Sequence, residues 1–296
     1  ISREIARNKR PTGYKAELAQ EDYKKRRKNC RPKSKLAFEP LRKEVLTLIG
    51  EEKLTPELAA GRLRRKYPND PKMQISHETV YQSIFRDEHM LGGLAEDLPR
   101  AGTKRRKRSD RKKSKGPAIP DRVSIVERPL IVETRSDFGH WEGDLVVGKG
   151  QDGFILTLVE RKSRLLRAVP VPTKHAELVC GAASEALLDF PRSWLKTLTF
   201  DNGKEFAAHK LITEQTGIRV YFAEPYSSYQ RGSNEQVNGL IRRYLPKGTS
   251  FAELTAQRVE HIEYAINNRP RKCLEYQSPY EVSSNYREMV LRALGA

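Results

Sequence analysis

The sequence predicts a multidomain protein in which all-α helix-turn-helix modules precede an α/β domain with a mixed five-stranded sheet and flanking helices. In the first third of the chain, apolar residues recur three and four positions apart, the spacing of amphipathic helices. From about residue 124 they gather into short runs that favour strands. We therefore expect the remainder of a first helix-turn-helix module with a basic helix at 1–35, a second module at 36–99, a linker at 100–123 and the α/β domain at 124–296.

Basic residues are concentrated at one end of the chain. The net charge is +18, and residues 1–122 hold 33 Lys and Arg against 17 Asp and Glu, whereas residues 123–296 hold 23 against 21. A polycation next to a nearly neutral domain indicates a polyanionic partner, DNA or RNA rather than a membrane surface. The alternative is a basic segment that only keeps the chain soluble.

Composition also limits the cellular setting. The three cysteines are far apart and odd in number, so they fit neither a disulfide framework nor a zinc site. No run of about 18 apolar residues and no secretory signal is visible, and we expect a soluble intracellular protein. Because the chain starts at Ile1, inside a helical pattern, we interpret it as part of a longer protein.

Three short helices are predicted between residues 36 and 90. The first covers 36–49, the second starts after Thr55-Pro56, an N-cap followed by proline, and the third starts after Ser76. The residues expected to face their common core are Leu41, Val45, Leu48, Ile49, Leu58, Ala59, Leu63, Val80, Ile84 and Phe85. A polar, capped third helix fits a helix-turn-helix domain that enters the major groove, and the alternative is a bundle used only for packing.

Several basic and polar side chains of the N-terminal half are candidates for DNA contact. Residues 1–8 resemble the back half of a recognition helix, and a second helical stretch covers 15–29. The linker has nine basic residues in twelve between positions 104 and 115, which suit phosphate tracking, although a nuclear-targeting run would look the same. The candidates are Arg3, Arg7, His77, Glu78, Thr79, Tyr81, Lys104, Arg105, Arg106, Lys107 and Arg108.

The α/β domain should alternate strands with helices. The predicted strands are 137–147, 153–160, 165–172, 195–200 and 218–223, and the predicted helices are 176–190, 206–216, one starting at Ser233, and 254–267. The apolar side of the 176–190 helix should consist of Leu178, Val179, Ala182, Ala186 and Leu187. Short spacers between the first three strands are typical of an antiparallel meander, whereas the later strands are separated by helices. In the mixed sheet that results, we expect the first and fourth strands to be neighbours, with the Ser233 helix packed across them.

The Ser233 helix presents a polar face opposite its apolar stripe. Ser233 and Gln236 have the spacing of a capping box, which predicts the helix start. Glu235 points away from the apolar stripe, and Arg242 follows two turns later on the same face, about 10 Å along the axis. Gly239 lies between them and would admit a close ligand.

Two upstream aspartates give this glutamate a chemical context. Asp144 lies inside the first strand, where an acid is unfavourable, and Asp201 follows the fourth strand in an Asp-Asn-Gly turn. Together with Glu235 they form an oxygen-rich set that suits Mg²⁺ or Mn²⁺, and two ions about 4 Å apart can drive in-line phosphoryl transfer. The alternative is a salt bridge, a turn residue and a helix cap with no common function.

The motifs carry a family resemblance. GHWEGDLVVG, TFDNGKEFA, AEPYSSYQRGSNEQVNGLIRRYLPKG, NNRPRK and SPYEV, with LTPELAAGRLRRKYPND and SHETVYQSIF, make the chain similar to the insertion-sequence-thirty family of bacterial DDE transposases. The resemblance implies an RNase H-like catalytic domain with Asp144, Asp201 and Glu235 as metal ligands, and 33 residues separate the last two. It places Arg242 near donor DNA. The chain departs from the family at its start, where the upstream part of the first DNA-binding module is missing.

The resemblance also implies partners and a cell compartment. It implies binding to terminal inverted repeats and target DNA, cleavage and strand transfer, often through a circular or end-joined intermediate, and work as a homo-oligomer, at least a dimer, in the bacterial cytoplasm on the nucleoid. Further residues that could hold the DNA ends are Asn202, Tyr226, Tyr229, Arg231, Asn234 and Asn238.

Trp141 is interpreted as a core residue, and Glu142 and Glu205 as acids that could be mistaken for members of the triad. The competing functions are a DNA-binding regulator with an idle catalytic domain, and a resolvase or ribonuclease H.

Overall fold

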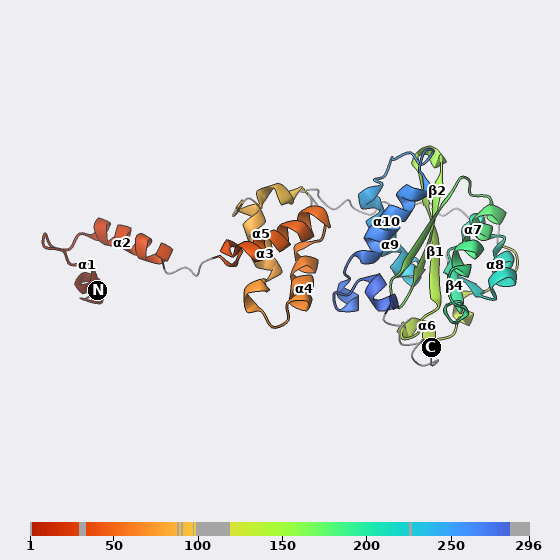
Figure 1. Cartoon of the computed structure of the whole chain (residues 1–296), viewed down its shortest axis with the longest axis horizontal. Helices are drawn as coiled ribbons and strands as arrows, with labels where there is room; N and C mark the ends of the chain where they lie inside the picture. The colour runs from red at the N-terminus through yellow and green to blue at the C-terminus, as the bar shows by residue number, and fades with distance from the viewer. Residues whose placement is uncertain are drawn as a thin grey trace. The chain divides into compact units, whose positions relative to one another are not determined.

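The structure is a computed structural model, and it describes residues 2–29, 34–87, 89, 91–96, 98, 119–224 and 227–284 (Figure 1). The chain divides into two compact units, residues 1–101 and 102–296, which are described separately. Within the described residues, no helix is both long and apolar enough to cross a membrane.

The first unit opens with two helices that confirm the helical interpretation of its N-terminal residues. These are α1 (Ser2–Asn8) and α2 (Ala16–Asn29). An ion pair of 2.7 Å between Arg10 and Asp22 ties the connection to α2, and a hydrogen bond of 2.9 Å from Arg26 to Asn8 links α2 to α1.

Three more helices, as predicted, form the rest of the described first unit. They are α3 (Glu39–Leu46), α4 (Pro56–Lys66) and α5 (His77–Phe85), with a π-helical extension of α3 over Thr47–Glu51. The two predicted N-caps are confirmed, since Thr55 Oγ1 accepts from the Leu58 N–H at 3.3 Å and Ser76 Oγ accepts from the Thr79 N–H at 3.1 Å.

The core of these helices matches the predicted stripe with one exception. Nearly all the predicted core residues of α3, α4 and α5 are buried, although Leu58 is only half-buried. Phe85 was expected to face inward, and this expectation is wrong, because its side chain is 73% exposed. It ends α5 one position beyond Ile84, which rotates it off the buried stripe and stacks it on Tyr81, with ring centroids 6.3 Å apart.

A mixed five-stranded sheet forms the centre of the second unit, as predicted. Its strands are β1 (His140–Val147), β2 (Phe154–Glu160), β3 (Leu166–Val171), β4 (Thr197–Phe200) and β5 (Arg219–Phe222). The order across the sheet is β3-β2-β1-β4-β5, with the first three strands antiparallel and β4 and β5 parallel to β1. The first and fourth strands are therefore neighbours, which confirms the sequence-based topology.

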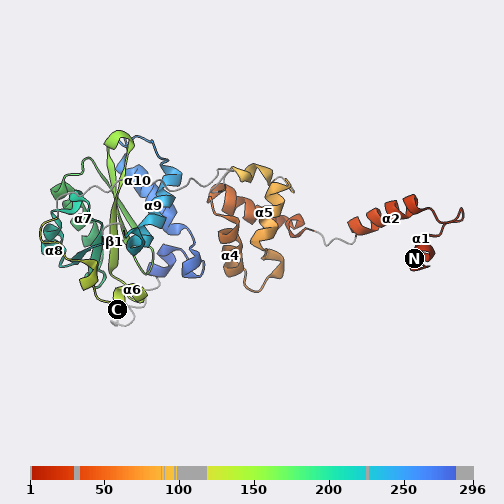
Figure 2. The ribbon, with the colours of Figure 1, turned by 180° about the vertical axis from the view of Figure 1, so that it is seen from behind.

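Helices cover both faces of this sheet (Figures 1 and 2). The helices are α7 (Ala176–Leu188) and α8 (His209–Thr216) on one face, and α9 (Gly232–Tyr244) and α10 (Ala256–Asn268) on the other. Two details of the prediction are wrong. Leu178 is 54% exposed rather than on the packed side of α7, and α9 packs against β1 and β2 rather than across β1 and β4.

The remaining short elements connect these parts. The short helices are η1 (Lys35–Ala37), η3 (Pro71–Met73), η5 (Gly92–Ala95), η6 (Ile125–Glu127), α6 (Ile131–Thr134), η7 (Lys149–Gln151), η8 (Arg192–Trp194), η9 (Lys204–Phe206), η10 (Ser228–Arg231) and η11 (Lys272–Leu274). Trp141 is fully buried and its indole N–H donates to the Trp194 carbonyl at 2.7 Å, which confirms it as a core residue.

Packing explains why a glycine, Gly143, lies in the middle of β1. A Cβ atom at this position would overlap the ring of Phe200, which lies fully buried against Gly143 and stacks on Phe206 with centroids 3.9 Å apart. The close approach of this ring needs a residue without a side chain. Gly143 is thus a packing requirement on the face opposite Asp144.

Candidate active site

Asp144 lies in the middle of β1 on the face covered by α9. Its Oδ2 accepts from the Asn238 side-chain amide at 2.8 Å, and its Oδ1 accepts from the Leu145 N–H at 2.9 Å. Burial raises the pKa of Asp144 above its usual value, Arg231 opposes this shift, and the nearby charge of Asp201 adds to it. The two hydrogen bonds therefore hold this carboxylate in one place. Burying its negative charge costs free energy, and a bound cation would reduce that cost.

Asp201 is brought to Asp144 by the register of the sheet. The parallel pairing of β1 with β4 sets Glu142 opposite Thr199, so the same register two residues further on sets Asp201 beside Asp144. Asp201 Oδ1 accepts from the Gly203 N–H at 2.9 Å, so the residue also shapes the turn after β4. The predicted meeting of these two acids is present in the structure.

Arg231 binds both aspartates. Its Nη1 lies 3.5 Å from Asp144 Oδ1, and its Nη2 lies 3.2 Å from Asp201 Oδ2. Nη1 also donates to the Gly143 carbonyl at 3.1 Å. The guanidinium thus stands where a cation shared by the two carboxylates would stand.

Glu235 does not join the pair in this structure. It is exposed on the first turn of α9, with no hydrogen bond or ion pair to a described residue. No three His, Cys, Asp or Glu side chains of the described ranges are grouped closely enough to hold a metal ion. Burial raises the pKa of Glu205, and the charges of Asp201 and Asp144 raise it further.

The start of α9 differs from the predicted capping box. The helix begins at Gly232, and its N-cap residue, Arg231, makes no side-chain cap. The carboxylate of Glu142 accepts from the backbone N–H groups of Ser233 and Asn234 instead, at 3.0 and 3.1 Å. Ser233 lies inside the helix rather than at its N-cap, and its Oγ accepts a hydrogen bond from Arg164.

The other candidates on and near α9 have distinct surroundings. Asn238 contacts Asp144, and Gly239 is exposed with open space beside it. Arg242 donates to the Val147 carbonyl at 2.7 Å, and its guanidinium carbon lies 5.8 Å from the centre of the Phe251 ring. Burial lowers the pKa of Arg242.

Two further asparagines support the same region from within the protein. Asn234 is fully buried, and its side-chain amide makes no hydrogen bond to a described residue. Asn202 donates to the Ala223 carbonyl at 2.6 Å, and its buried Oδ1 has no partner among the described residues. Tyr226 and the side chain of Tyr229 lie outside the described residues.

The candidates in the first unit stand at different degrees of exposure. Arg3, Arg7, His77 and Glu78 are exposed, whereas Thr79 and Tyr81 are half-buried at the start of α5. The linker candidates Lys104, Arg105, Arg106, Lys107 and Arg108 lie outside the described residues. The exposed candidates are accessible to a DNA partner.

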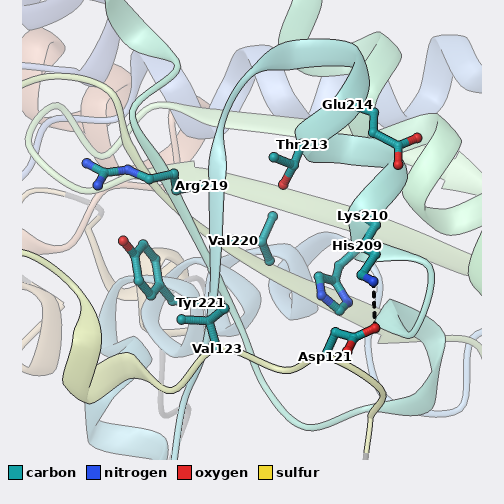
Figure 3. A pocket seen from close by; sticks show the side chains of 9 residues that line it. All are labelled: Asp121, Val123, His209, Lys210, Thr213, Glu214, Arg219, Val220 and Tyr221. Atoms are coloured by element: carbon teal, nitrogen blue, oxygen red, sulfur yellow. Dashed lines mark ion pairs between the residues drawn. The ribbon is translucent and has the colours of Figure 1, made fainter.

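A surface pocket of about 380 Å³ lies elsewhere on the second unit, between α8 and β5 (Figure 3). Lys210 and Asp121 form an ion pair of 2.5 Å at its rim, and His209 packs edge-on against Phe222 beside it. None of the three proposed acids lines this pocket. It is therefore separate from the acid pair.

Comparison with known proteins places the chain in a family. The integrase core domain model matches residues 135–228, which contain Asp144 and Asp201. The transposase InsI of element IS30A from Escherichia coli (strain K12) is 40% identical over 95% of this chain and 74% of that protein. The chain belongs to the IS30 family of transposases. Its relatives include the IS1086 transposase of Cupriavidus metallidurans, 38% identical over 95% of this chain and 84% of that protein, and the IS4351 transposase of Bacteroides fragilis, 39% identical with the same coverages.

Membership in the IS30 family confirms the resemblance found in the motifs. The chain is a DNA transposase, a polynucleotidyl transferase with an integrase-type, RNase H-like core. Such a core implies dependence on divalent metal ions in general. Among solved structures, the catalytic core of BIV integrase aligns at 19% identity with a TM-score of 0.39, over 51% of this chain and 97% of that chain.

Proposed function

We propose that this IS30-family transposase binds the terminal inverted repeats of its element and cuts and joins DNA with a triad of Asp144, Asp201 and Glu235. The observation that carries the proposal is the pairing of Asp144 with Asp201 around one guanidinium, at 3.5 and 3.2 Å. Two carboxylates this close favour a shared cation, and oxygen ligands suit Mg²⁺ or Mn²⁺. Glu235, on the helix that Asn238 ties to Asp144, is the third ligand of this site.

Two divalent ions are expected at this site. When bound, such ions activate the attacking oxygen and neutralise the charge on the leaving 3′-oxygen. Asp144 and Asp201 would hold them, because both carboxylates already face one positive charge. Arg231 competes with the ions for the same oxygens, so its guanidinium is free to contact a DNA phosphate once they bind.

The protein groups around the acids orient them. The Asn238 amide fixes one oxygen of Asp144, and the Leu145 N–H fixes the other. The Gly203 N–H does the same for Asp201. Hydrogen bonds of this kind set the direction in which each carboxylate can bind a ligand, so these groups prepare the site before DNA arrives.

DNA binding is assigned to both units. In the first unit, α5 with His77, Thr79 and Tyr81 would enter the major groove, and Arg3 and Arg7 would contact the element end. The five linker residues from Lys104 to Arg108 would follow the phosphate backbone, with an affinity that falls steeply as salt increases.

In the second unit, we assign contacts with the DNA ends to side chains around α9. They are Arg242, Asn202, Arg231, Asn238 and Tyr229, whereas the full burial of Asn234 contradicts the expected contact of that side chain with DNA. Arg231 and Asn238 support this assignment best, because both already contact the acid pair. We further propose a homo-oligomer, at least a dimer, that acts in the bacterial cytoplasm on the nucleoid, since both ends of an element must be handled together.

The test is cleavage and joining of a labelled terminal-repeat duplex with Mg²⁺. Asp144→Asn keeps the side-chain shape and its hydrogen bond with Asn238, with the amide oxygen as acceptor. We expect cleavage to fall by at least about 10²- to 10³-fold, as for the loss of one charge-stabilising group, while DNA binding persists. Retained cleavage would remove the triad assignment.

A further inference from the structure

The start of α9 is held by an acid from the sheet. A helix leaves its first backbone N–H groups without partners inside the helix, and they usually find a side-chain cap nearby in sequence. Here the two N–H groups of Ser233 and Asn234 both bind one oxygen of Glu142, at 3.0 and 3.1 Å. Glu142 is about ninety residues away along the chain, so this cap ties a helix to a strand.

The charge of Glu142 is fully enclosed and compensated. The side chain has no exposed surface, and its second oxygen forms an ion pair of 2.7 Å with Arg161, which is also buried. Arg161 reaches Glu133 at 3.2 Å, and Glu133 also pairs with Arg128. A buried carboxylate with this many partners is rigidly placed, because any movement would leave a buried charge unpaired.

The location of Glu142 connects it to the acids of the proposed triad. It lies two residues before Asp144 on the same face of β1, since side chains alternate along a strand. The two amides that it binds directly precede Glu235 in α9. One strand therefore fixes Asp144 and, through Glu142, the start of the helix that carries Glu235.

We propose that Glu142 is a positioning residue, which sets where α9 begins over β1 and so where Glu235 stands relative to Asp144 and Asp201. It touches neither DNA nor the reacting atoms. Because the proposal rests on the triad proposed above, its test must distinguish the failure of the anchor from the failure of the triad.

Glu160 provides a matched control. It is also a fully buried glutamate of the sheet, and one of its oxygens accepts from the Ser163 N–H at 2.6 Å while the other accepts from the Gly139 N–H at 3.2 Å. Its partners belong to the start of β1 and the turn after β2 rather than to α9. Both glutamates are buried acceptors of two backbone N–H groups, and Glu142 also pairs with Arg161. Only the loss of Glu142 releases the proposed catalytic helix.

The experiment compares Glu142→Ala, Glu142→Gln, Glu160→Ala and Glu235→Gln in the full chain. Hydrogen exchange with mass spectrometry follows the α9 and α10 amides, thermal melting follows stability, and gel assays follow binding and cleavage of a terminal-repeat duplex at saturating DNA and Mg²⁺. Glu142→Gln retains the side-chain shape and one acceptor oxygen, so it keeps the test informative if the alanine variant folds poorly.

We expect Glu142→Ala to speed exchange at the start of α9 about tenfold or more, with α10 unchanged, and to lower the cleavage rate by about 10- to 100-fold at unchanged DNA affinity. Glu142→Gln should lie between it and the wild type. Glu160→Ala should melt at a similarly lowered temperature yet keep cleavage within about threefold of the wild type.

Three results would overturn the proposal. Unchanged exchange at Ser233 and Asn234 would remove the anchor itself. An equal loss of cleavage in Glu160→Ala would reduce the effect to general destabilisation. Wild-type cleavage in Glu142→Ala, with Glu235→Gln inactive, would show that the triad works without this anchor. Retained cleavage in Glu235→Gln would instead overturn the triad, whatever Glu142 does.

Discussion

The two faces of the central sheet are built differently. The face under α7 and α8 is almost entirely apolar, with large buried side chains such as Trp141, Phe200 and Phe222. The face under α9 and α10 encloses a mixture of apolar residues and buried polar groups, among them Glu142 and Thr157. Apolar contacts are non-directional, whereas a hydrogen bond fixes distance and direction. The first face therefore supplies stability, and the second fixes the position of chemically active groups.

The edge of the sheet shows how the polar face achieves this. Glu263 on α10 accepts from the Ala168 N–H at 2.7 Å, and Asn267 pairs with both backbone groups of Leu166 at 2.8 Å. These side chains occupy hydrogen-bonding groups of β3 that would otherwise form an open sheet edge. Both helices of this face are thus fixed to strands by side-chain-to-backbone bonds, α9 through Glu142 and α10 through these two residues.

The largest effect on the apolar face is expected from Gly143→Ala. The new methyl group would enter the space filled by the Phe200 ring, and overpacking of this kind costs about 1–3 kcal/mol of unfolding free energy. Urea denaturation would measure the loss. A variant as stable as the wild type would mean that the apolar face is not closely packed at Gly143.

On the polar face, Arg242→Ala should affect strand transfer more than stability. The guanidinium binds the Val147 carbonyl and lies near the Phe251 ring, so we expect a stability loss below about 1 kcal/mol. Strand transfer into target DNA should fall about tenfold if Arg242 holds donor DNA, which corresponds to about 1.4 kcal/mol. Joining assays with precut ends would measure it. Unchanged joining would assign Arg242 to the protein contacts alone.

His140, buried on the polar face, should make stability depend on pH. Its ring lies 2.8 Å from Thr197 Oγ1, and burial lowers its pKa from 6.5 to about 4. Between pH 6.5 and about 4 the unfolded chain binds a proton at His140 that the folded chain does not. The contribution of the neutral, buried ring to the free energy of unfolding is therefore complete above pH 6.5 and is lost as the pH falls toward 4. Urea denaturation of the wild type and His140→Gln between pH 7 and 4.5 should show a difference that shrinks with acid. Parallel plots of unfolding free energy against pH for the two proteins would contradict this prediction.

The smallest effect is expected from Gly239→Ala. Outside the backbone of α9 and the two neighbouring residues, no heavy atom of a described residue lies within 4 Å of the added Cβ. Alanine is favoured over glycine in a helix by about 1 kcal/mol or less, so stability should rise slightly. If DNA passes close to this part of α9, cleavage should fall despite that gain. The comparison of melting temperature with cleavage rate tests this, and unchanged cleavage would mean that DNA does not approach Gly239.

The sequence was sufficient to predict the sheet but not to predict how α9 begins. Strand-like runs and their spacers predicted the order of the strands, and this order brought Asp144 next to Asp201. The capping box was wrong because local spacing at Ser233 cannot reveal an acid ninety residues upstream that competes for the same amides. Glu142 was set aside as an acid that could be mistaken for Asp144. Only tertiary structure reveals which of two neighbouring acids faces a helix end and which faces another acid.

The predictions that Phe85 and Leu178 are buried are wrong for a related reason. Both residues continue an apolar helical pattern, but each lies at a margin of its stripe and is exposed. Periodicity predicts a direction, and burial depends on what packs there.

The most direct measurement is the position of bound Mn²⁺ in a structure of this chain with a terminal-repeat duplex, located by its anomalous scattering. The account predicts manganese between Asp144 and Asp201, with Glu235 as a further ligand and the Arg231 guanidinium displaced from the two carboxylates. Manganese bound elsewhere would contradict the proposed triad. So would manganese bound at the two aspartates beside the scissile phosphate while Glu235 remains exposed and far from the metal.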